Sequence, residues 1–227
     1  MEVFPKIFLP SPLEVAKSLV DGFVSGELWL NIWASLWRVM VGFLIGAGVA
    51  LPVGILTGNV GWAEALLQPL TEFLRYMPVP AFLPLCILWF GIGELEKIVV
   101  IFLGTFFQLA VLVFDDARAV PNEFLEIGYT LGLSRMESLS KVVLPSALPR
   151  IFEDLRVSFG WAWSYVVVAE LVAANHGVGF MIMQSQRYLR TADVIAGILV
   201  IGILGLVSDL FFRGVSRVLF PYEDSRL

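Results

Sequence analysis

The sequence is poor in charged residues and in the residue types that build enzymatic or metal sites. Charged residues make up 15% of the 227 residues and hydrophobic residues 58%, whereas an ordinary globular domain is about 25% charged. The chain has one cysteine, Cys86, and one histidine, His176. These counts exclude a disulfide framework within one chain and a metal centre rich in cysteine or histidine. The net charge of -5 argues against nucleic-acid binding, which requires a basic face.

Phosphate-binding and cofactor-binding motifs are also missing. The sequence contains no G-x-x-x-x-G-K-[ST] loop, so the chain is not expected to bind and split ATP. The Gly177-x-Gly179 pair follows no predicted strand and lacks the third glycine of a dinucleotide fingerprint. We therefore predict that the chain is not an enzyme and holds no cofactor. A pump built on it would take its energy from another polypeptide.

The chain does contain long uncharged runs. No Asp, Glu, Lys or Arg occurs in residues 39–63, 76–93 or 98–114. Each run is about long enough to cross a hydrocarbon core of ~30 Å at ~1.5 Å per helical residue. Together with two later runs, they predict an all-α polytopic membrane helix bundle of about five transmembrane helices. The expected spans are about 30–57, 64–92, 97–115, 155–175 and 193–215.

The second expected span is the least regular, because prolines kink helices by deleting a backbone hydrogen bond. It holds or adjoins Pro69, Pro78, Pro80 and Pro84. The first span carries Gly42 and Gly46 in a G-x-x-x-G motif, which lets two helices approach closely. The motif favours packing within the chain over a contact between subunits.

Two regions follow from this pattern. Residues 1–28 form an N-terminal interfacial segment, in which the amphipathic run 13–24 predicts a short helix at the membrane surface; a loosely ordered tail is the alternative. Residues 29–222 form the transmembrane domain, with a polar loop at about 116–150. Nine Lys and Arg residues lie on the side of this loop and five on the other, which predicts a cytoplasmic loop and an outer N-terminus.

The polar stretch 126–145 predicts a helical corner. Ser134 and Glu137 have the spacing of a capping box, in which each side chain binds the other residue's amide. Gly132 precedes them, where a left-handed turn ends a helix at little cost. Leu144 and Pro145 are expected to end the second helix. An ordinary connecting loop is the alternative interpretation.

The same stretch resembles the "EAA" loop of ABC-transporter permeases, with matches at Glu126, Gly132, Leu144 and Pro145. The two alanines of that motif are Ile127 and Gly128 in this chain. The segments PSPLEVAKSL, ILWFGIGELEKI, GYTLGLSR and VVLPSALPRIF resemble the nitrate, sulfonate and taurine branch of these permeases. Such matches follow one another from Leu9 to Tyr222.

The resemblance implies a type I ABC importer permease in the cell inner membrane, surrounded by membrane lipid. It implies import of a small anion such as nitrate, a sulfonate, taurine or bicarbonate. The implied partners are a second permease subunit in a homodimer, two ATP-binding cassette subunits and an extracytoplasmic substrate-binding protein. The 126–145 loop would be the coupling helix: Glu126 contacts the ATPase, Gly132 makes the corner, and Ser134 and Glu137 hold the helix start.

Four residues inside the spans are further candidates. Arg38 and Glu170 are ionisable groups within expected spans, where such groups normally face a partner or a water-filled path. They either pair with each other or line the translocation pathway, and pairing is favoured because a carboxylate does not help an anion to pass. Trp161 and Trp163 begin the expected fourth span, as members of an aromatic belt or as an inner gate.

Two other functions fit parts of the sequence. An ion-coupled secondary transporter would bind its ions at broken helices near the midplane, but the only mid-span charges are Arg38 and Glu170. A permease for a thiamine-type pyrimidine precursor also fits the family resemblance. Members of this family usually cross the membrane once before the point at which this sequence starts, so either a further helix precedes it or five helices suffice.

Overall fold

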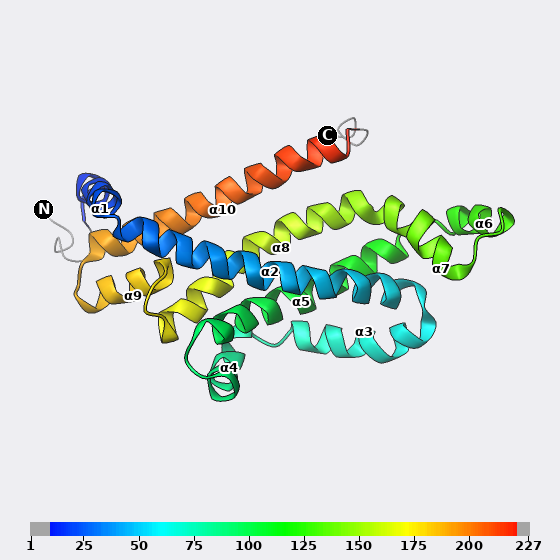
Figure 1. Cartoon of the computed structure of the whole chain (residues 1–227), viewed down its shortest axis with the longest axis horizontal. Coiled ribbons are helices and arrows are strands. Elements are labelled where there is room, and N and C mark those ends of the chain that lie inside the picture. The colour runs from blue at the N-terminus through cyan, green and yellow to red at the C-terminus, as the bar shows by residue number, and fades with distance from the viewer. Residues whose placement is uncertain (1–9, 222–227) are drawn as a thin grey trace, which may run out of the picture. The chain divides into compact units, whose positions relative to one another are not determined.

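The computed structural model describes residues 10–221, and every regular element in that range is a helix (Figure 1). The first nine residues of the expected interfacial segment and Tyr222 at the end of the expected domain lie outside the described residues. The elements are α1 (Pro12–Ser25), α2 (Glu27–Asn59), α3 (Gly61–Arg75), η1 (Val79–Phe82), α4 (Leu83–Phe90), α5 (Glu94–Arg118), α6 (Asn122–Thr130), α7 (Arg135–Ser138), the π-helix η2 (Leu139–Val143), α8 (Leu144–Ala173), α9 (Val178–Arg187) and α10 (Thr191–Leu219).

Within the described part of the chain, four stretches of helix are long and apolar enough to cross a membrane. They are α2, α5, Met136–Val172 and α10. The expected second span is interrupted, because the helix stops at Arg75 and resumes at Val79. Proline disfavours helix in the residue before it and has no N–H to donate, so Pro78 and Pro80 account for the break. Residues 10–221 therefore contain four such helices, or five if the interrupted pair crosses as one span.

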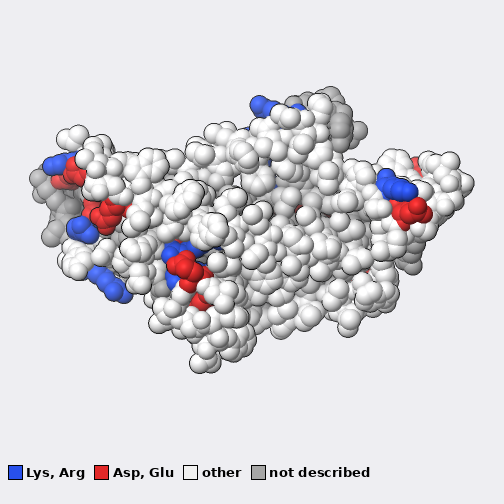
Figure 2. Space-filling model, viewed as in Figure 1, with Lys and Arg blue, Asp and Glu red and all other residues white. Residues whose placement is uncertain are grey.

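The chain divides into two compact units, and α2, α5, α8 and α10 each contribute to both. Unit 1 comprises Met1–Gly42, Val79–Ile101 and Ala162–Val207. Unit 2 comprises Phe43–Pro78, Phe102–Trp161 and Ser208–Leu227. Charged side chains are few on the face that Figure 2 shows, as expected of a chain whose outer surface faces lipid.

The core of unit 1 includes a cluster of Leu28, Val178 and Val200, against which Leu19 of α1 and Ile182 of α9 pack. The expected amphipathic helix is present as α1, and it begins with a capping box. The Ser11 amide donates to Glu14 Oε2 at 2.7 Å, and the Glu14 amide donates to the Ser11 hydroxyl. These bonds satisfy amides that have no partner inside the helix, so α1 has a defined start.

The core of unit 2 includes a cluster of aromatic rings. The ring of Phe43 lies edge-on to Phe159, with centroids 4.8 Å apart, and Phe212 contacts both rings. Aromatic pairs prefer such edge-to-face geometry because the ring edge is positive and the face negative. The cluster joins α2, α8 and α10 within this unit.

The glycines of α2 allow close packing against α5 of the same chain. In unit 1, a Cβ at Gly42 would lie 2.7 Å from Ile101 Cβ. In unit 2, a Cβ at Gly46 would lie 3.1 Å from Thr105 Cβ, and one at Gly54 would lie 2.7 Å from Val113 Cβ. The G-x-x-x-G motif therefore serves packing within the chain, as the sequence analysis favours.

Candidate functional site

The stretch 126–145 forms a sharp helical corner in unit 2, where α6 and α7 lie next to each other (Figure 1). At the end of α6, the Leu133 amide donates to the Gly128 carbonyl at 3.0 Å. Gly132 has φ +82°, a left-handed conformation that glycine adopts without the steric penalty of a Cβ. This is the geometry of a Schellman motif, and it turns the chain at the glycine that the sequence indicates.

The next helix begins with the capping box that the spacing predicts. The Ser134 amide donates to Glu137 Oε2 at 3.0 Å, and the Glu137 amide donates to the Ser134 hydroxyl at 3.3 Å. Lys141 Nζ adds an ion pair to Glu137 Oε1 at 3.0 Å, one helical turn further on. Both sides of the corner are therefore held by hydrogen bonds that the local sequence supplies.

The expectation that Leu144 and Pro145 end this second helix is wrong. The chain continues from α7 through the π-helix η2 directly into α8, which begins at Leu144. Pro145 has no N–H to donate, and the wider π-helical turn before it opens the hydrogen-bond ladder at that point. Leu144 and Pro145 therefore connect the corner to a long membrane helix and do not end the helix between the two.

The corner exposes apolar side chains on this rigid backbone. Leu131 is 77% exposed, Met136 66% and Ile127 57%. Glu126, Gly132 and Ser134 are exposed as well, whereas Gly128 is buried. Exposed apolar groups that lie on a loop held by capping bonds are typical of a surface that binds another protein.

A second constellation is buried in unit 1 and is centred on Arg38, which is 3% exposed. Its Nε and Nη2 donate to the two carboxylate oxygens of Glu94, each at 2.6 Å. Its Nη1 donates to Glu170 Oε1 at 2.7 Å and to the His176 carbonyl at 2.6 Å. The structure thus brings the two sequence candidates Arg38 and Glu170 together and adds Glu94.

Glu170 is 1% exposed, and the rest of its hydrogen-bonding capacity is used locally. The Ser35 hydroxyl donates to it at 2.8 Å, and the Gly179 amide donates to its Oε2 at 2.9 Å. The Val178 amide in turn donates to the Ser35 hydroxyl at 2.9 Å. A carboxylate bound in this way is compatible with burial because it has both a counter-charge and donors.

The loop before α9 packs directly against this carboxylate. A Cβ at Gly177 would clash with the Glu170 carboxylate carbon, and one at Gly179 would lie 2.9 Å from Glu170 Cβ. The Gly177 amide donates to Asn31 Oδ1 at 2.8 Å. The G-x-G pair is therefore required for close approach to Glu170.

Sequence reasoning missed Asn31, Ser35 and Glu94 as parts of this cluster. A signal was present, because residues 31, 35 and 38 follow the i, i+4, i+7 spacing of one helix face. Each is a polar residue within an apolar helix. No such pattern points to Glu94, which the fold brings to Arg38 from the start of α5.

The described residues include no group of three or more His, Cys, Asp or Glu side chains placed to hold a metal ion. The family described as "Binding-protein-dependent transport system inner membrane component" matches residues 50–221. The chain is a permease of this family. It is a multi-pass protein of the inner membrane and not an enzyme.

Relatives match the permease over nearly its whole length. The putative aliphatic sulfonates transport permease protein SsuC of Bacillus subtilis (strain 168) is 39% identical over 217 residues, which are 96% of this chain and 79% of the relative. The taurine transport system permease protein TauC of Escherichia coli (strain K12) is 37% identical and covers 98% of this chain and 83% of its own. The bicarbonate transport system permease protein CmpB of Synechococcus elongatus (strain ATCC 33912 / PCC 7942 / FACHB-805) is 34% identical. The match covers 86% of this chain and 70% of the relative.

The fold is that of a solved importer. Two crystal forms of the MetNI methionine ABC transporter, both in inward facing conformations, superpose on the permease with TM-scores of 0.74 and 0.76. The two superpositions cover 83% and 84% of this chain and 94% and 96% of the matched MetNI chains. The sequence identities are 20% and 22%. The likeness shows that the permease has the type I ABC importer fold.

The two tryptophan candidates do not mark the beginning of a helix. Since α8 begins at Leu144, Trp161 and Trp163 lie in its second half. Trp163 is 3% exposed and Trp161 is half-buried. The expectation that Trp163 belongs to a lipid-facing aromatic belt is therefore wrong. A role of either residue as a gate stays a prediction.

Proposed function

We propose that this permease forms the passage for a small anion in an ATP-driven importer and that separate ATP-binding cassette subunits drive it through the corner at 126–145. The assembly contains two copies of the permease, two ATPase subunits and an extracytoplasmic substrate-binding protein. The anion is an alkanesulfonate, taurine or bicarbonate, because the names of the relatives include transport systems for aliphatic sulfonates, taurine and bicarbonate, or nitrate, which the resemblance in the sequence implies.

The observation that carries this proposal is the exposure of Leu131 and Met136 on the hydrogen-bonded corner. A corner that transmits force must be stiff, and the capping bonds at Gly132 and Ser134 restrict its backbone. It must also bind its driver tightly, and large exposed apolar side chains supply most of the affinity at protein interfaces. The continuous helical stretch Met136–Val172 then links the ATPase contact to the membrane helices.

The test is copurification of the ATPase subunit with the permease from the native membrane. Leu131→Asp with Met136→Asp should weaken capture of the ATPase at least about tenfold, since charge is placed where apolar groups are buried. The matched control is Leu131→Met with Met136→Leu, which preserves size and polarity and should capture the ATPase normally. Normal capture by the Asp variant would contradict docking at this corner.

The transport step is tested in liposomes with the complete assembly. Uptake of taurine, an alkanesulfonate, bicarbonate and nitrate is measured with ATP and with the binding protein. The proposal is supported if uptake of any one of these anions depends on both ATP and the binding protein. Uptake driven by an ion gradient through the permease alone would support a secondary transporter. Uptake of a pyrimidine precursor would show that the solute is this precursor and not an anion.

A further inference from the structure

A pocket of about 310 Å³ opens in unit 1 between α1, the start of α2, α9 and the start of α10. Pockets that hold small ligands begin at about this size. The permease's coupling corner and the Arg38 cluster do not contribute to its lining. Its polar lining includes Ser18, Asp21, Glu27, Ser185, Arg190 and Asp193.

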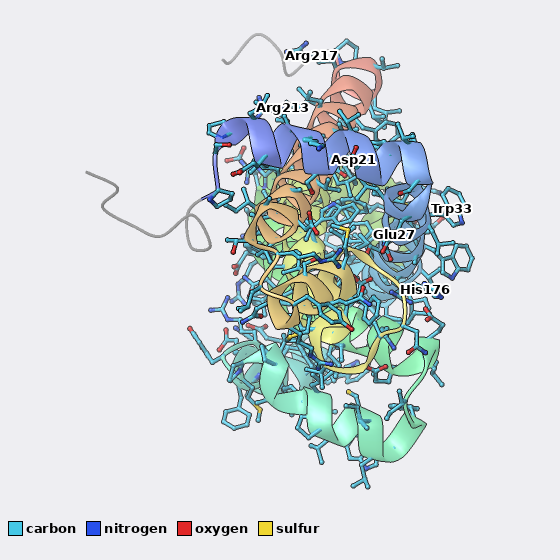
Figure 3. All side chains as sticks on the ribbon, turned by 90° about the vertical axis from the view of Figure 1, so that its left-hand side faces the viewer. Asp21, Glu27, Trp33, His176, Arg213 and Arg217 are labelled. Atoms are coloured by element: carbon cyan, nitrogen blue, oxygen red, sulfur yellow. The ribbon has the colours of Figure 1, made fainter. Side chains whose placement is uncertain are left out.

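Two of the acidic groups in this pocket have no counter-charge. Asp21 on α1 and Glu27 at the start of α2 are exposed, and neither carboxylate forms a hydrogen bond or ion pair within residues 10–221. Figure 3 shows Glu27 between Asp21 and the His176 loop in this view. Asp193, in contrast, accepts a hydrogen bond from Ser18 at 2.7 Å and pairs with Arg190 at 3.3 Å. The pocket therefore has a surplus of negative charge.

Ser185 provides an independent sign that the pocket has an occupant. It is 1% exposed and lines the pocket from α9. Its hydroxyl forms no hydrogen bond inside the described range of the chain. A pocket-lining hydroxyl without a protein partner is able to accept a hydrogen bond from a ligand group in the pocket.

The chemistry of the lining selects the kind of cation. Carboxylates and hydroxyls accept hydrogen bonds, so they suit a primary ammonium with three N–H donors. A trimethylammonium group donates none and is typically held by aromatic rings, and the lining contains no aromatic side chain. Arg190 pairs with Asp193 through Nε, which leaves the outer nitrogens of its guanidinium able to bind a phosphate.

The position of the pocket beside α1 identifies the source of the ammonium. Leu13, Val20 and Val24 of α1 are 80%, 58% and 82% exposed, while Lys17 and Asp21 give the same helix a polar side. Such helices lie in the membrane surface with their apolar residues among the lipid chains. We propose that the pocket binds the phosphoethanolamine headgroup of an aminophospholipid. Asp21, Glu27 and Ser185 receive its ammonium, and Arg190 receives its phosphate.

The test is native mass spectrometry of the full-length permease in micelles that contain phosphatidylethanolamine and phosphatidylcholine at equal concentration. The wild type should retain phosphatidylethanolamine about tenfold over phosphatidylcholine, and Asp21→Asn with Glu27→Gln should abolish that preference. Arg190→Gln should weaken binding of both lipids, because both carry the phosphate. The control, Glu72→Gln with Asp115→Asn, removes two exposed or half-exposed carboxylate charges elsewhere and should keep the preference.

Three results would overturn the assignment. The first is equal retention of both lipids by the wild type. The second is an unchanged preference in the Asp21→Asn, Glu27→Gln variant. The third is displacement of the lipid by an equal concentration of soluble O-phosphoethanolamine, which would make the pocket a site for a free solute. None of these results depends on transport activity, so they are separate from any failure of the proposed transport function.

Discussion

The guanidinium of Arg38 holds the carboxylate of Glu94 with two parallel hydrogen bonds, from Nε to Oε2 and from Nη2 to Oε1, each 2.6 Å long. This bidentate geometry is among the strongest that side chains form. The remaining nitrogen of the same guanidinium binds Glu170. One side chain thereby ties together α2, the start of α5 and the end of α8 within unit 1.

Replacing Arg38 with leucine should destabilise the permease strongly. The change leaves Glu170, which is 1% exposed, without its counter-charge, and breaking a buried ion pair in this way costs about 3–5 kcal/mol. The expected result is a fall in the thermal unfolding temperature of the purified permease. Arg213→Leu is the control, because Arg213 is 53% exposed and surface ion pairs contribute about 0–1 kcal/mol. Equal falls in the two variants would contradict a special role for the buried pair.

Exchanging the charges, with Arg38→Glu and Glu170→Arg together, should not restore stability even though the two residues are in direct contact. A glutamate at position 38 would face Glu94, and an arginine at 170 would face the Gly179 amide, a donor that now binds the carboxylate. Adding Glu94→Gln removes the repulsion and should recover part of the loss. Thermal unfolding of the double and triple variants measures this, and full rescue by the double variant would show that Glu94 and Gly179 contribute little.

Gly177→Ala should lower the free energy of unfolding by at least about 2 kcal/mol, because overpacking and backbone strain add. Gly177 has φ +130°, and a Cβ there would clash with the carboxylate of Glu170. Gly202→Ala is the matched control, since nothing lies within 4 Å of a Cβ at that helical position. It should be neutral or stabilise by up to ~1 kcal/mol through helix propensity. Chemical denaturation compares the two, and similar values would refute the steric explanation.

Gly132→Val should uncouple ATP hydrolysis from transport in the reconstituted importer. Gly132 has φ +82°, a conformation that costs a β-branched residue about 1–3 kcal/mol, so the corner would relax into another shape. Gly132→Asn is the control, because asparagine tolerates the left-handed region. We expect the Asn variant to retain most of its uptake per ATP and the Val variant to lose it. Intact coupling in the Val variant would show that the corner does not need its present geometry.

Much of the fold could be predicted from local patterns. The uncharged runs predict helices that span a membrane, and the resemblance at Glu126, Gly132, Leu144 and Pro145 implies the family. Gly132, Ser134 and Glu137 determine the corner by interactions within a few residues of one another, so tertiary contacts are not needed to place it. The helix across Pro145 could not be anticipated, because a proline indicates a missing donor and not whether a π-helical turn accommodates it.

The sequence by itself determined that this chain is a membrane protein with a capped helical corner, because hydropathy and capping act over short distances along the chain. Only the tertiary structure decided which polar residues meet inside unit 1. Arg38, Glu94 and Glu170 are far apart in sequence. Arg38 and Glu170 were compatible with paired or pathway-lining positions, and Glu94 was not indicated at all, until the packing of the helices brought the three together. A buried charge is defined by its neighbours in space, which a linear pattern does not contain.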